Sequence, residues 1–361
     1  MIVIRAPLRV SFGGGGTDLP AFYEEHGGFV LSAAITRYCY ALIEESADGS
    51  GSVTSADYGA RFSWRPRRLP AIQAPLALPK AALREVAQRG ALTRGVAIAL
   101  SADVPPGSGL GSSSAMAVAT LQALSTVYET PLTASEAASR ACALEIDRLG
   151  MPIGKQDQYA SAYGGVNTIT FTRAGVEVAP LRLSADIRRT LAQRLQLFWT
   201  GRSHDSAGIL RGQRRDTQTR ADVVELLRRI KATAYDMRDA LQAGDVDSFG
   251  QLLDCAWQTK RQLSTAISSS VIDDWYAAAK DAGAIGGKIT GAGGGGFLLL
   301  YTPPERQRAV RETMSRCGLS ETPVAFDTCG VARLSEAPSD WSQRFDAPRA
   351  GEAPSPMQCS A

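Results

Sequence analysis

The chain has 361 residues, more than a single hydrophobic core usually serves, so we expect two domains in close contact. Hydrophobic residues make up 44% and charged residues 21% of it, as in an ordinary globular protein, and its net charge of +3 is too small for a dedicated nucleic-acid binder. No stretch of about 20 apolar residues occurs, which disfavours a membrane span.

The cysteines and the N-terminal residues indicate the cellular compartment in which the protein is expected. Six cysteines are scattered without a CxxC pair or a metal-ligand spacing, which predicts buried, reduced thiols. The first ten residues alternate apolar side chains with arginines and lack the apolar run of a signal peptide. We therefore expect a cytoplasmic protein. His26 and His204 are the only histidines, and neither lies in a nucleophile-bearing motif, which disfavours acyl transfer.

The first third of the chain is predicted to consist of strands and turns. Residues 2–12, 28–44 and 95–104 have the β-branched content and turn boundaries of strands. Residues 65–79 are rich in proline and are predicted to form a loop that leads into a short helix near residues 80–89.

Helical patterns follow. Residues 112–128 carry apolar side chains at helical spacing, directly after a Gly/Ser loop. A second helix is predicted over residues 133–149, because Thr133 and Glu136 have the spacing of a capping box. A pair of strands is expected within residues 165–183.

The pattern changes near residue 190. A long amphipathic helix is predicted over residues 221–243, with Gly244 as its C-terminal cap. Further elements are predicted as two helices and then two strands, at residues 249–263, 271–282, 296–301 and 323–327. These elements predict an α+β protein with domains at residues 1–190 and 191–335, followed by a Pro- and Ser-rich tail, residues 336–361, that is predicted to be disordered.

Three glycine-rich loops each adjoin a predicted strand or helix. The second of them follows a strand and opens a helix, and it consists of Pro106, Gly107, Ser108, Gly109, Leu110, Gly111, Ser112, Ser113 and Ser114. Glycines free the backbone N–H groups, and a helix start adds unpaired donors and a positive dipole end, so this loop predicts an anion site. Its spacing fits neither a Walker A loop nor a dinucleotide fingerprint. A tight strand-to-helix turn with N-cap serines is the alternative.

The first loop contains four consecutive glycines, residues 13–16, followed by Thr17 and Asp18. The third loop, residues 290–296, precedes an apolar strand. Each has a structural alternative: a flexible turn in which Asp18 caps the next helix, and a hairpin or crossover turn. Three such loops in one chain favour a shared phosphate-rich site.

The loops resemble a known family. Arg-Ala-Pro-x-Arg leading to a glycine-rich Thr-Asp, Pro-Pro-Gly-x-Gly-Leu-Gly-Ser-Ser, and Gly-Ala-Gly-Gly-Gly are similar, in order and separation, to motifs one, two and three of the GHMP kinases. The resemblance covers nearly the whole chain except the tail. Within that superfamily, residues 154–160, the following Gly164-Gly165, Thr200-Gly201 and the four-glycine form of motif one are most similar to D-glycero-D-manno-heptose 7-phosphate kinases.

The resemblance implies a fold and two cofactors. The expected architecture is an N-terminal domain like ribosomal protein S5 domain 2 and a ferredoxin-like C-terminal domain, with the active cleft between them. ATP and Mg²⁺ are implied, with the second loop around the ATP phosphates and with Ser113 and Glu145 as magnesium ligands. The alternative for Glu145 is a surface carboxylate paired with Arg148.

The resemblance also implies catalytic residues. Asp157 matches the aspartate that accepts a proton from the attacking sugar hydroxyl or orients it. Arg9 matches an arginine that faces the reacting groups, and Lys155 is placed to stabilise the transferred charge or to lower the pKa of Asp157. The alternatives are an aspartate that caps a helix and two solvated cations.

Residues that resemble the family's substrate-binding positions come from several segments: Gly15, Gly16, Thr17, Asp18, Gly164, Gly165, Gly201, Arg202, His204, Gly293 and Gly294. The sequence departs from the heptose 7-phosphate kinase pattern at one place. An arginine shortly after the Thr-Gly is replaced by His204, with Arg202 just before it. If the family arginine contacts the substrate phosphate, one of these two residues must take its place.

The resemblance implies transfer of the ATP γ-phosphate to the anomeric oxygen of D-glycero-D-manno-heptose 7-phosphate, which gives the 1,7-bisphosphate for nucleotide-heptose biosynthesis. The alternatives are another anomeric sugar kinase, acting on fucose, arabinose or a uronic acid, a non-catalytic homologue that senses sugar and nucleotide, and a nucleotide-binding oxidoreductase. The implied partners are a sugar phosphate and ATP, with no nucleic acid and no membrane, and the sequence leaves a homodimer open.

Overall fold

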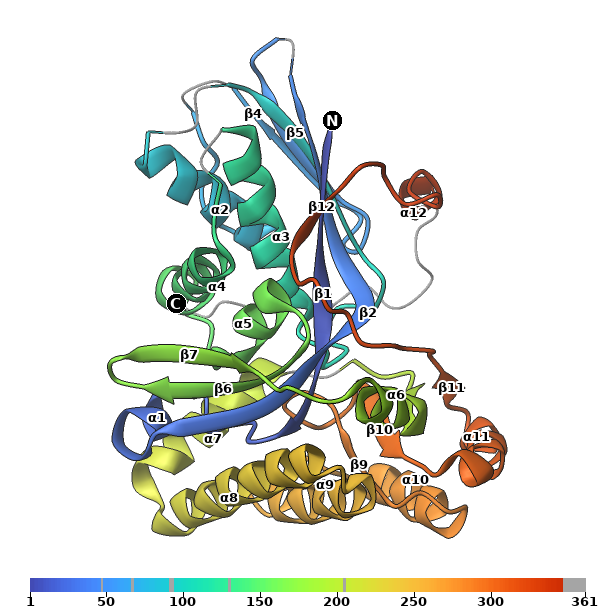
Figure 1. The fold of residues 1–361 in the computed structure, drawn as a ribbon. Coiled ribbons are helices and arrows are strands. Elements are labelled where there is room, and N and C mark those ends of the chain that lie inside the picture. Colours follow the sequence, from blue (N-terminus) through green and yellow to red (C-terminus); the bar gives the residue numbers. More distant parts are fainter. Residues whose placement is uncertain (47, 66–67, 91–93, 129–130, 204–205, 347–361) are drawn as a thin grey trace.

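The computed structural model describes residues 1–46, 48–65, 68–90, 94–128, 131–203 and 206–346. Figure 1 shows a long twisted sheet in the upper half, with helices on one side, and a layer of long helices across the lower end. Among the described residues, two sheets of eight and four strands form the framework. The N-terminal strand reaches from the upper end of the long sheet down to the helical layer (Figure 1), so the first glycine loop lies between the two halves.

The larger sheet has the order β12-β1-β2-β5-β3-β4, with β6 paired to β2 and β7 paired to β6. All its pairings are antiparallel except the one between β3 and β5. Its strands are β1 (Ile2–Gly13), β2 (Gly28–Glu45), β3 (Gly51–Ser55), β4 (Ala60–Trp64), β5 (Val96–Ala102), β6 (Val166–Thr172), β7 (Gly175–Pro180) and β12 (Ala332–Leu334). The strands predicted at residues 2–12, 28–44 and 95–104 and the strand pair within 165–183 are confirmed.

Helix α3 (Ser112–Val127) lies directly against β1 and β2. Its buried face is rich in small residues, such as Ala115, Ala119 and Ala123, which let the helix backbone approach the sheet closely. The neighbouring helices are α1 (Pro20–His26), α2 (Ala77–Gln88), α4 (Ala134–Cys142) and α5 (Gln156–Tyr163). This packing fixes the N-terminus of α3 beside the middle of β1.

The predicted capping box is present at the start of α4. Thr133 accepts a hydrogen bond from the Glu136 N–H, and the Glu136 carboxylate accepts one from the Thr133 N–H. The helix predicted over residues 133–149 is confirmed in its extent, but its second half is a π-helix, η1 (Ala143–Arg148), instead of an α-helix. The wider turn is a change of backbone pitch that apolar periodicity does not reveal, and such turns recur at functional sites.

The smaller sheet has the order β11-β8-β10-β9 and is covered by long helices. Its strands are β8 (Leu195–Trp199), β9 (Gly286–Ile289), β10 (Phe297–Tyr301) and β11 (Ser320–Glu321). The helices of this half are α6 (Ala185–Arg194), α7 (Ser206–Thr219), α8 (Ala221–Ala243), α9 (Val246–Arg261), α10 (Ser270–Asp281), the 3₁₀ turn η2 (Pro304–Arg306) and α11 (Gln307–Arg316). Helix α8 begins and ends as predicted, with Gly244 at φ 79° as its cap.

A continuous apolar core joins the two halves. Phe12 of β1 packs edge-on against Phe249 of α9, which in turn packs against Tyr301 of β10. Phe29 of β2 stacks on Tyr235 of α8 with ring centroids 3.9 Å apart. Because these aromatic contacts cross between the sheets, the glycine loops are held between two parts that pack directly on each other.

Two C-terminal predictions are wrong. The strand predicted at residues 323–327 forms only an isolated bridge, between Phe326 and Ile35. The prediction of disorder from residue 336 onward is wrong for residues 336–346, which are ordered against the larger sheet. Trp341 packs on Tyr40, and Arg344 of α12 (Gln343–Asp346) donates a hydrogen bond to Asp103 over 2.8 Å. Two anchoring side chains outweigh the disorder-prone composition around them. The rest of the predicted tail lies outside the described residues.

The thiols are free among the described residues, but they are not all buried. Cys39 and Cys142 are buried as predicted, whereas Cys255 and Cys329 are exposed and Cys317 is half-buried. In the same part of the chain, no helix has both the length and the apolar character needed to cross a membrane.

Candidate active site

The second and third glycine loops touch each other through their backbones. A Cβ atom placed on Gly291 would lie 2.7 Å from the Gly109 Cα, and one placed on Gly109 would lie 2.6 Å from the Thr290 carbonyl oxygen. Thr290 Oγ1 also donates to the Ser108 carbonyl oxygen over 3.2 Å. Any side chain at either glycine would separate the loops, so this contact requires glycine on both sides.

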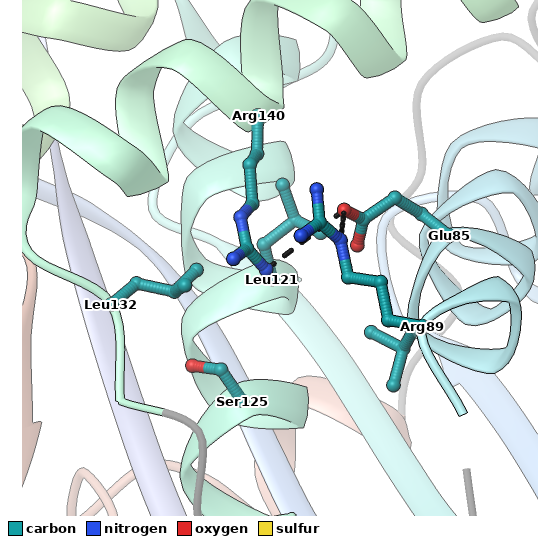
Figure 2. Close-up of a pocket in the computed structure, with 7 residues that line it drawn as sticks. Glu85, Arg89, Leu121, Ser125, Leu132 and Arg140 are labelled. Atoms are coloured by element: carbon teal, nitrogen blue, oxygen red, sulfur yellow. Dashed lines mark hydrogen bonds and ion pairs between the residues drawn. The ribbon is translucent and has the colours of Figure 1, made fainter. Parts of the chain in front are cut away.

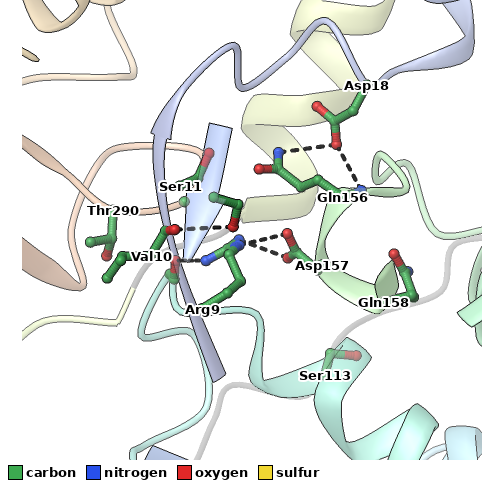
Figure 3. A network of polar contacts seen from close by, with 12 residues as sticks. Arg9, Val10, Ser11, Asp18, Ser113, Gln156, Asp157, Gln158 and Thr290 are labelled. Carbon is green, nitrogen blue, oxygen red and sulfur yellow. Dashed lines mark hydrogen bonds and ion pairs between the residues drawn. The ribbon is translucent and has the colours of Figure 1, made fainter. Parts of the chain in front are cut away.

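Arg9 links β1 to the second loop and to the start of α5. Its Nε and Nη2 atoms each donate to a different oxygen of Asp157 over 2.7 Å, and its Nη1 donates to the Gly109 carbonyl oxygen over 2.7 Å (Figure 3). The Arg9 residue is only 4% exposed. A buried, bidentate arginine–carboxylate pair has a fixed geometry, so these three bonds orient the Asp157 carboxylate.

Asp157 lies beside the N-terminus of α3. A Cβ atom on Gly111, the residue before that helix, would lie 3.1 Å from Asp157 Oδ2. The Asp157 side chain is 23% exposed, so its carboxylate can be reached from solvent. It does not cap α5, because Lys155 is the N-cap of that helix and no side chain caps it. The helix-capping alternative for Asp157 is therefore wrong.

Glu145 is fully buried in the π-helix. Its two oxygens accept hydrogen bonds of 2.6 Å each, one from Ser113 Oγ and one from Gln158 Nε2. Burial, reinforced by the charge of Asp157, raises the pKa of Glu145 to about 7, although its hydrogen bonds oppose that shift. Arg148 donates to Gln88 instead, so the alternative of a surface Glu145–Arg148 pair is wrong.

Ser113 is exposed at the first turn of α3, with the Glu145 carboxylate directly behind it. This pair supplies only oxygen donors, which are the ligands that Mg²⁺ prefers. Among the described residues, no group of three or more His, Cys, Asp or Glu side chains could hold a metal ion. A magnesium ion here would therefore need phosphate oxygens and water to complete its coordination, which is its usual habit.

Asp18 is buried and is held by hydrogen bonds from the first glycine loop and from the start of α5. It accepts a hydrogen bond from the Gly16 N–H over 2.9 Å. It also accepts bonds from the Gln156 N–H over 3.3 Å and from Gln156 Nε2 over 3.0 Å (Figure 3). Burial and the charge of Asp157 raise the pKa of Asp18. Since Leu19 is the N-cap of α1, the alternative in which Asp18 caps that helix is wrong.

Several buried polar atoms near the first loop have no hydrogen-bond partner among the described residues. They are Ser11 Oγ, Gln156 Oε1 and Gln213 Nε2. Cβ atoms placed on Gly15 and Gly16 would lie 3.6 Å from Ser11 Oγ and 2.3 Å from Gln213 Nε2, respectively. Because buried polar atoms are normally satisfied, this cluster fits a ligand that carries many hydroxyl groups.

Other predicted site residues make different contacts. Lys155 Nζ lies over the Tyr23 ring, 5.2 Å from its centroid, so its described contact is not with Asp157. Thr17 Oγ1 donates to the carbonyl oxygens of Gly14 and Phe29 and so braces the first loop. His204 lies outside the described residues.

The remaining predicted residues lie away from the Asp157 carboxylate or are exposed. Gly164 ends α5, at the far end from Asp157, and packs on Gly330, while Gly165 donates to the Asp327 carbonyl oxygen over 2.8 Å. Gly293 and Gly294 pack on Ile267. Gly201 and Arg202 are exposed, and the Arg202 carbonyl oxygen accepts from the Gly296 N–H.

Sequence reasoning missed two lysines. Lys288 Nζ donates to the Ser11 carbonyl oxygen over 2.8 Å, and Lys260 Nζ donates to the Gly291 carbonyl oxygen. Both are buried, and neither forms an ion pair with a described residue. The available signal was their rarity, since an arginine-rich chain contains only six lysines and one of these two directly precedes the third glycine loop.

A cavity of about 190 Å³ lies elsewhere, between α2, α3 and α4. Figure 2 shows Glu85 facing two guanidinium groups across it, with Arg89 Nε at 2.6 Å and Arg140 Nη1 at 3.9 Å from Glu85 Oε1. Its α3 residues, Leu121 and Ser125, are more than two turns from the start of that helix, roughly 12 Å or more along the axis. This cavity is therefore separate from the contact between the glycine loops.

Comparison with known proteins gives matches along most of the chain. The family model of the GHMP kinases N terminal domain matches residues 77–165, and that of the GHMP kinases C terminal domain matches residues 237–318. A D-glycero-alpha-D-manno-heptose 7-phosphate kinase of Campylobacter jejuni is 30% identical over 309 residues, which cover 84% of this chain and 90% of that protein. A bifunctional fucokinase/GDP-fucose pyrophosphorylase of Arabidopsis thaliana is 29% identical over 86% of this chain and 31% of its own length.

Solved structures of kinases also match this chain over most of its length. A D-glycero-D-manno-heptose 1-phosphate kinase from Bacteroides thetaiotaomicron has a TM-score of 0.79 and 28% identity, and the match covers 94% of this chain and all of that chain. A Methanococcus jannaschii mevalonate kinase, at 18% identity and a TM-score of 0.72, covers 90% of this chain and 98% of its own. The second match shows a shared fold alone.

Proposed function

The chain belongs to the GHMP kinase family, and from that premise we propose that it transfers the γ-phosphoryl group of ATP to the anomeric oxygen of a sugar phosphate. It is a sugar kinase, as are the heptose 7-phosphate kinase and the fucokinase named above. The proposed acceptor is D-glycero-D-manno-heptose 7-phosphate, and the product is the 1,7-bisphosphate. The observation that carries the proposal is the Asp157 carboxylate, held by Arg9 beside the N-terminus of α3.

The proposed ATP phosphate site is the loop of residues 106–114 with the first turn of α3. GHMP kinases use ATP as substrate, and Gly111 at the N-cap has no side chain that could occupy the first-turn N–H groups. Those donors and the positive end of the helix dipole favour an anion. The close contact between Gly109 and Gly291 stabilises the conformation of this loop before a ligand binds.

Ser113 and Glu145 are the proposed magnesium ligands. A bound Mg²⁺ would neutralise charge on the ATP phosphates. Glu145 contributes a carboxylate that is already fixed by Gln158 and by Ser113, and Ser113 Oγ offers an exposed oxygen at the helix start.

Asp157 is the proposed proton acceptor. The anomeric oxygen forms a bond to the γ-phosphorus, the bond from that phosphorus to the ADP oxygen breaks, and the hydroxyl proton passes to the Asp157 carboxylate. Arg9 fixes the orientation of the carboxylate and, by resemblance, faces the transferred group. An anomeric hydroxyl is more acidic than an ordinary alcohol, so a carboxylate suffices as the base.

The proposed acceptor pocket lies around the first glycine loop. Asp18, Gln156, Ser11 and Gln213 provide buried donors and acceptors there, and several of these atoms have no hydrogen-bond partner in the part of the chain that the structure describes. A sugar with many hydroxyl groups would satisfy them. The roles proposed for Lys155, Gly164, Gly165, Gly201, Arg202, His204, Gly293 and Gly294 rest on resemblance, and the enzyme is proposed to act in the cytoplasm, where ATP is available.

A substrate panel tests the acceptor. We expect ADP release to be fastest with D-glycero-D-manno-heptose 7-phosphate and much slower with free heptose, fucose, arabinose and a uronic acid. The measurement is kcat/KM for each sugar, with the phosphorylated position of the product assigned by ³¹P NMR. A preference for a free sugar would overturn the heptose phosphate assignment and leave the sugar kinase assignment intact.

Replacing Glu145 with Gln tests the metal site. This change removes the negative charge of the ligand while keeping the shape of the side chain, so it should raise the Mg²⁺ concentration for half-maximal activity by about 10–100-fold. The readout is initial rate against free Mg²⁺ at fixed ATP. Asp147→Asn, on the exposed side of the same π-helix, is the matched control and should leave the curve unchanged. Equal magnesium dependence in Glu145→Gln and wild type would exclude Glu145 as a ligand.

A further inference from the structure

Lys260 is a buried cation behind the contact between the glycine loops. It lies in the last turn of α9, is 7% exposed, and donates from Nζ to the carbonyl oxygen of Gly291. Gly291 packs on Gly109 of the second loop, and Gly109 in turn accepts the hydrogen bond from Arg9. The Lys260 ammonium therefore lies against the third glycine loop, beside the contact of that loop with the second loop, and it comes from the opposite half of the chain.

The charges around Lys260 do not balance. Arg9 on β1 and Lys288 on β9 are the neighbouring cations, and both are buried. The neighbouring carboxylates are Asp18, which is held by backbone and amide donors, and Asp157, which is bonded to Arg9. Neither lysine has an ion-pair partner among the described residues.

The pKa values of both lysines are lowered as a result. Burial and the charge of Arg9 lower the pKa of Lys260 to about 8, although Asp18 opposes the shift. Burial, Lys260 and Arg9 lower the pKa of Lys288 well below its usual value. A buried ammonium without a counter-ion is unfavourable, because the charge has lost its hydration. An anion that enters this region would remove that penalty and would restore the charged form of lysine.

We propose that Lys260 is a phosphate-binding residue that the second half of the chain contributes to the active site, where its ammonium group binds a phosphoryl oxygen at the junction of the three glycine loops. The inference rests on the proposed kinase function, since it assigns a ligand within the same site. The phosphoryl group comes either from ATP or from the phosphorylated acceptor. Its binding supplies a counter-ion to Lys260, whereas Arg9 is already paired with Asp157.

Proton uptake is the distinguishing readout. Calorimetric titration of the full-length protein at pH 8.5, in two buffers of different ionisation enthalpy, measures protons taken up on binding. Since free Lys260 with a pKa of about 8 is largely neutral at that pH, a phosphate ligand should drive uptake of roughly three-quarters of a proton. ATP alone, the sugar phosphate alone and the free sugar are titrated separately, so the ligand that gives uptake identifies the source of the phosphoryl group.

Lys260→Met should abolish that uptake and weaken binding of the same ligand by about 10–100-fold, as expected for a lost charge-assisted hydrogen bond. Lys231→Met is the matched control, because Lys231 also donates to backbone carbonyl oxygens, but to those of His26 and Gly27, which belong to none of the three glycine loops. It should change neither quantity.

Two results would overturn the proposal. One is an unchanged uptake and affinity in Lys260→Met, with only a lower melting temperature, which would make Lys260 a structural support for the third loop. The other is the absence of uptake in the wild-type protein with either phosphate ligand, a measurement that does not depend on the variant being folded. In both cases wild-type turnover of the sugar would continue, so the kinase assignment would stand.

Discussion

Replacing Asp157 with Asn is expected to lower kcat by about 10²–10⁴-fold, the usual effect of removing a general base. Asn has the same shape but cannot accept the proton of the anomeric hydroxyl. Because the carboxylate lies beside the phosphate loop without belonging to it, the affinity for ATP should stay within a few-fold of the wild type. Steady-state kinetics and titration with a non-hydrolysable ATP analogue measure the two quantities.

A surface carboxylate provides the matched control for that variant. Asp186 is also paired with an arginine, Arg189, at 2.6 Å, but its side chain is 79% exposed. Asp186→Asn should leave kcat unchanged. If Asp157→Asn retained a tenth or more of the wild-type kcat, Asp157 would not be the proton acceptor, and a phosphoryl oxygen or solvent would have to take the proton instead.

Arg9→Met is expected to have the second large effect, on both stability and activity. It removes both hydrogen bonds to Asp157 and the bond to Gly109, and it leaves the Asp157 carboxylate partly buried without a cation. Breaking a buried ion pair from one side typically costs about 3–5 kcal/mol, and the 23% exposure of Asp157 favours the lower end. Thermal or urea unfolding measures the loss.

The two effects of Arg9 can be separated with further variants. Arg9→Lys keeps the charge but loses the planar fork, so it should recover most of the stability and little of the activity. The double variant Arg9→Met/Asp157→Asn should unfold at higher denaturant than Arg9→Met alone, because the unpaired buried charge is gone. Arg189→Met, on the surface, should change the unfolding free energy by less than about 0.5 kcal/mol. If Arg9→Met matched Arg189→Met, the pair would have no organising role.

Local features of the structure could be predicted from sequence because their causes are local. Helix α8 was predicted to the residue from its apolar periodicity and from Gly244, and the capping box at Thr133 was predicted from two side chains three residues apart. The three glycine loops can also be recognised in the sequence, because runs of glycine next to strands and helices indicate places where the backbone approaches another group closely.

Contacts between distant segments could not be derived in the same way. Arg9 and Asp157 are 148 residues apart, and only the resemblance to a known family brought them together as candidates. Lys260 gave no signal in its own segment, where it continues an amphipathic helix, and its meaning depends on burial against a loop about thirty residues later. The π-helix that turns Glu145 inward depends on packing against α3 and α5, so helical periodicity overlooked it.

A crystal structure with a non-hydrolysable ATP analogue, Mg²⁺ and D-glycero-D-manno-heptose 7-phosphate tests the central claim most directly. The terminal phosphate is expected within hydrogen-bonding distance of the backbone N–H groups at residues 112–114. The anomeric oxygen is expected about 3 Å from the Asp157 carboxylate. A nucleotide bound elsewhere, for example in the cavity beside Glu85 and Arg140, or an anomeric oxygen far from Asp157, would contradict the account.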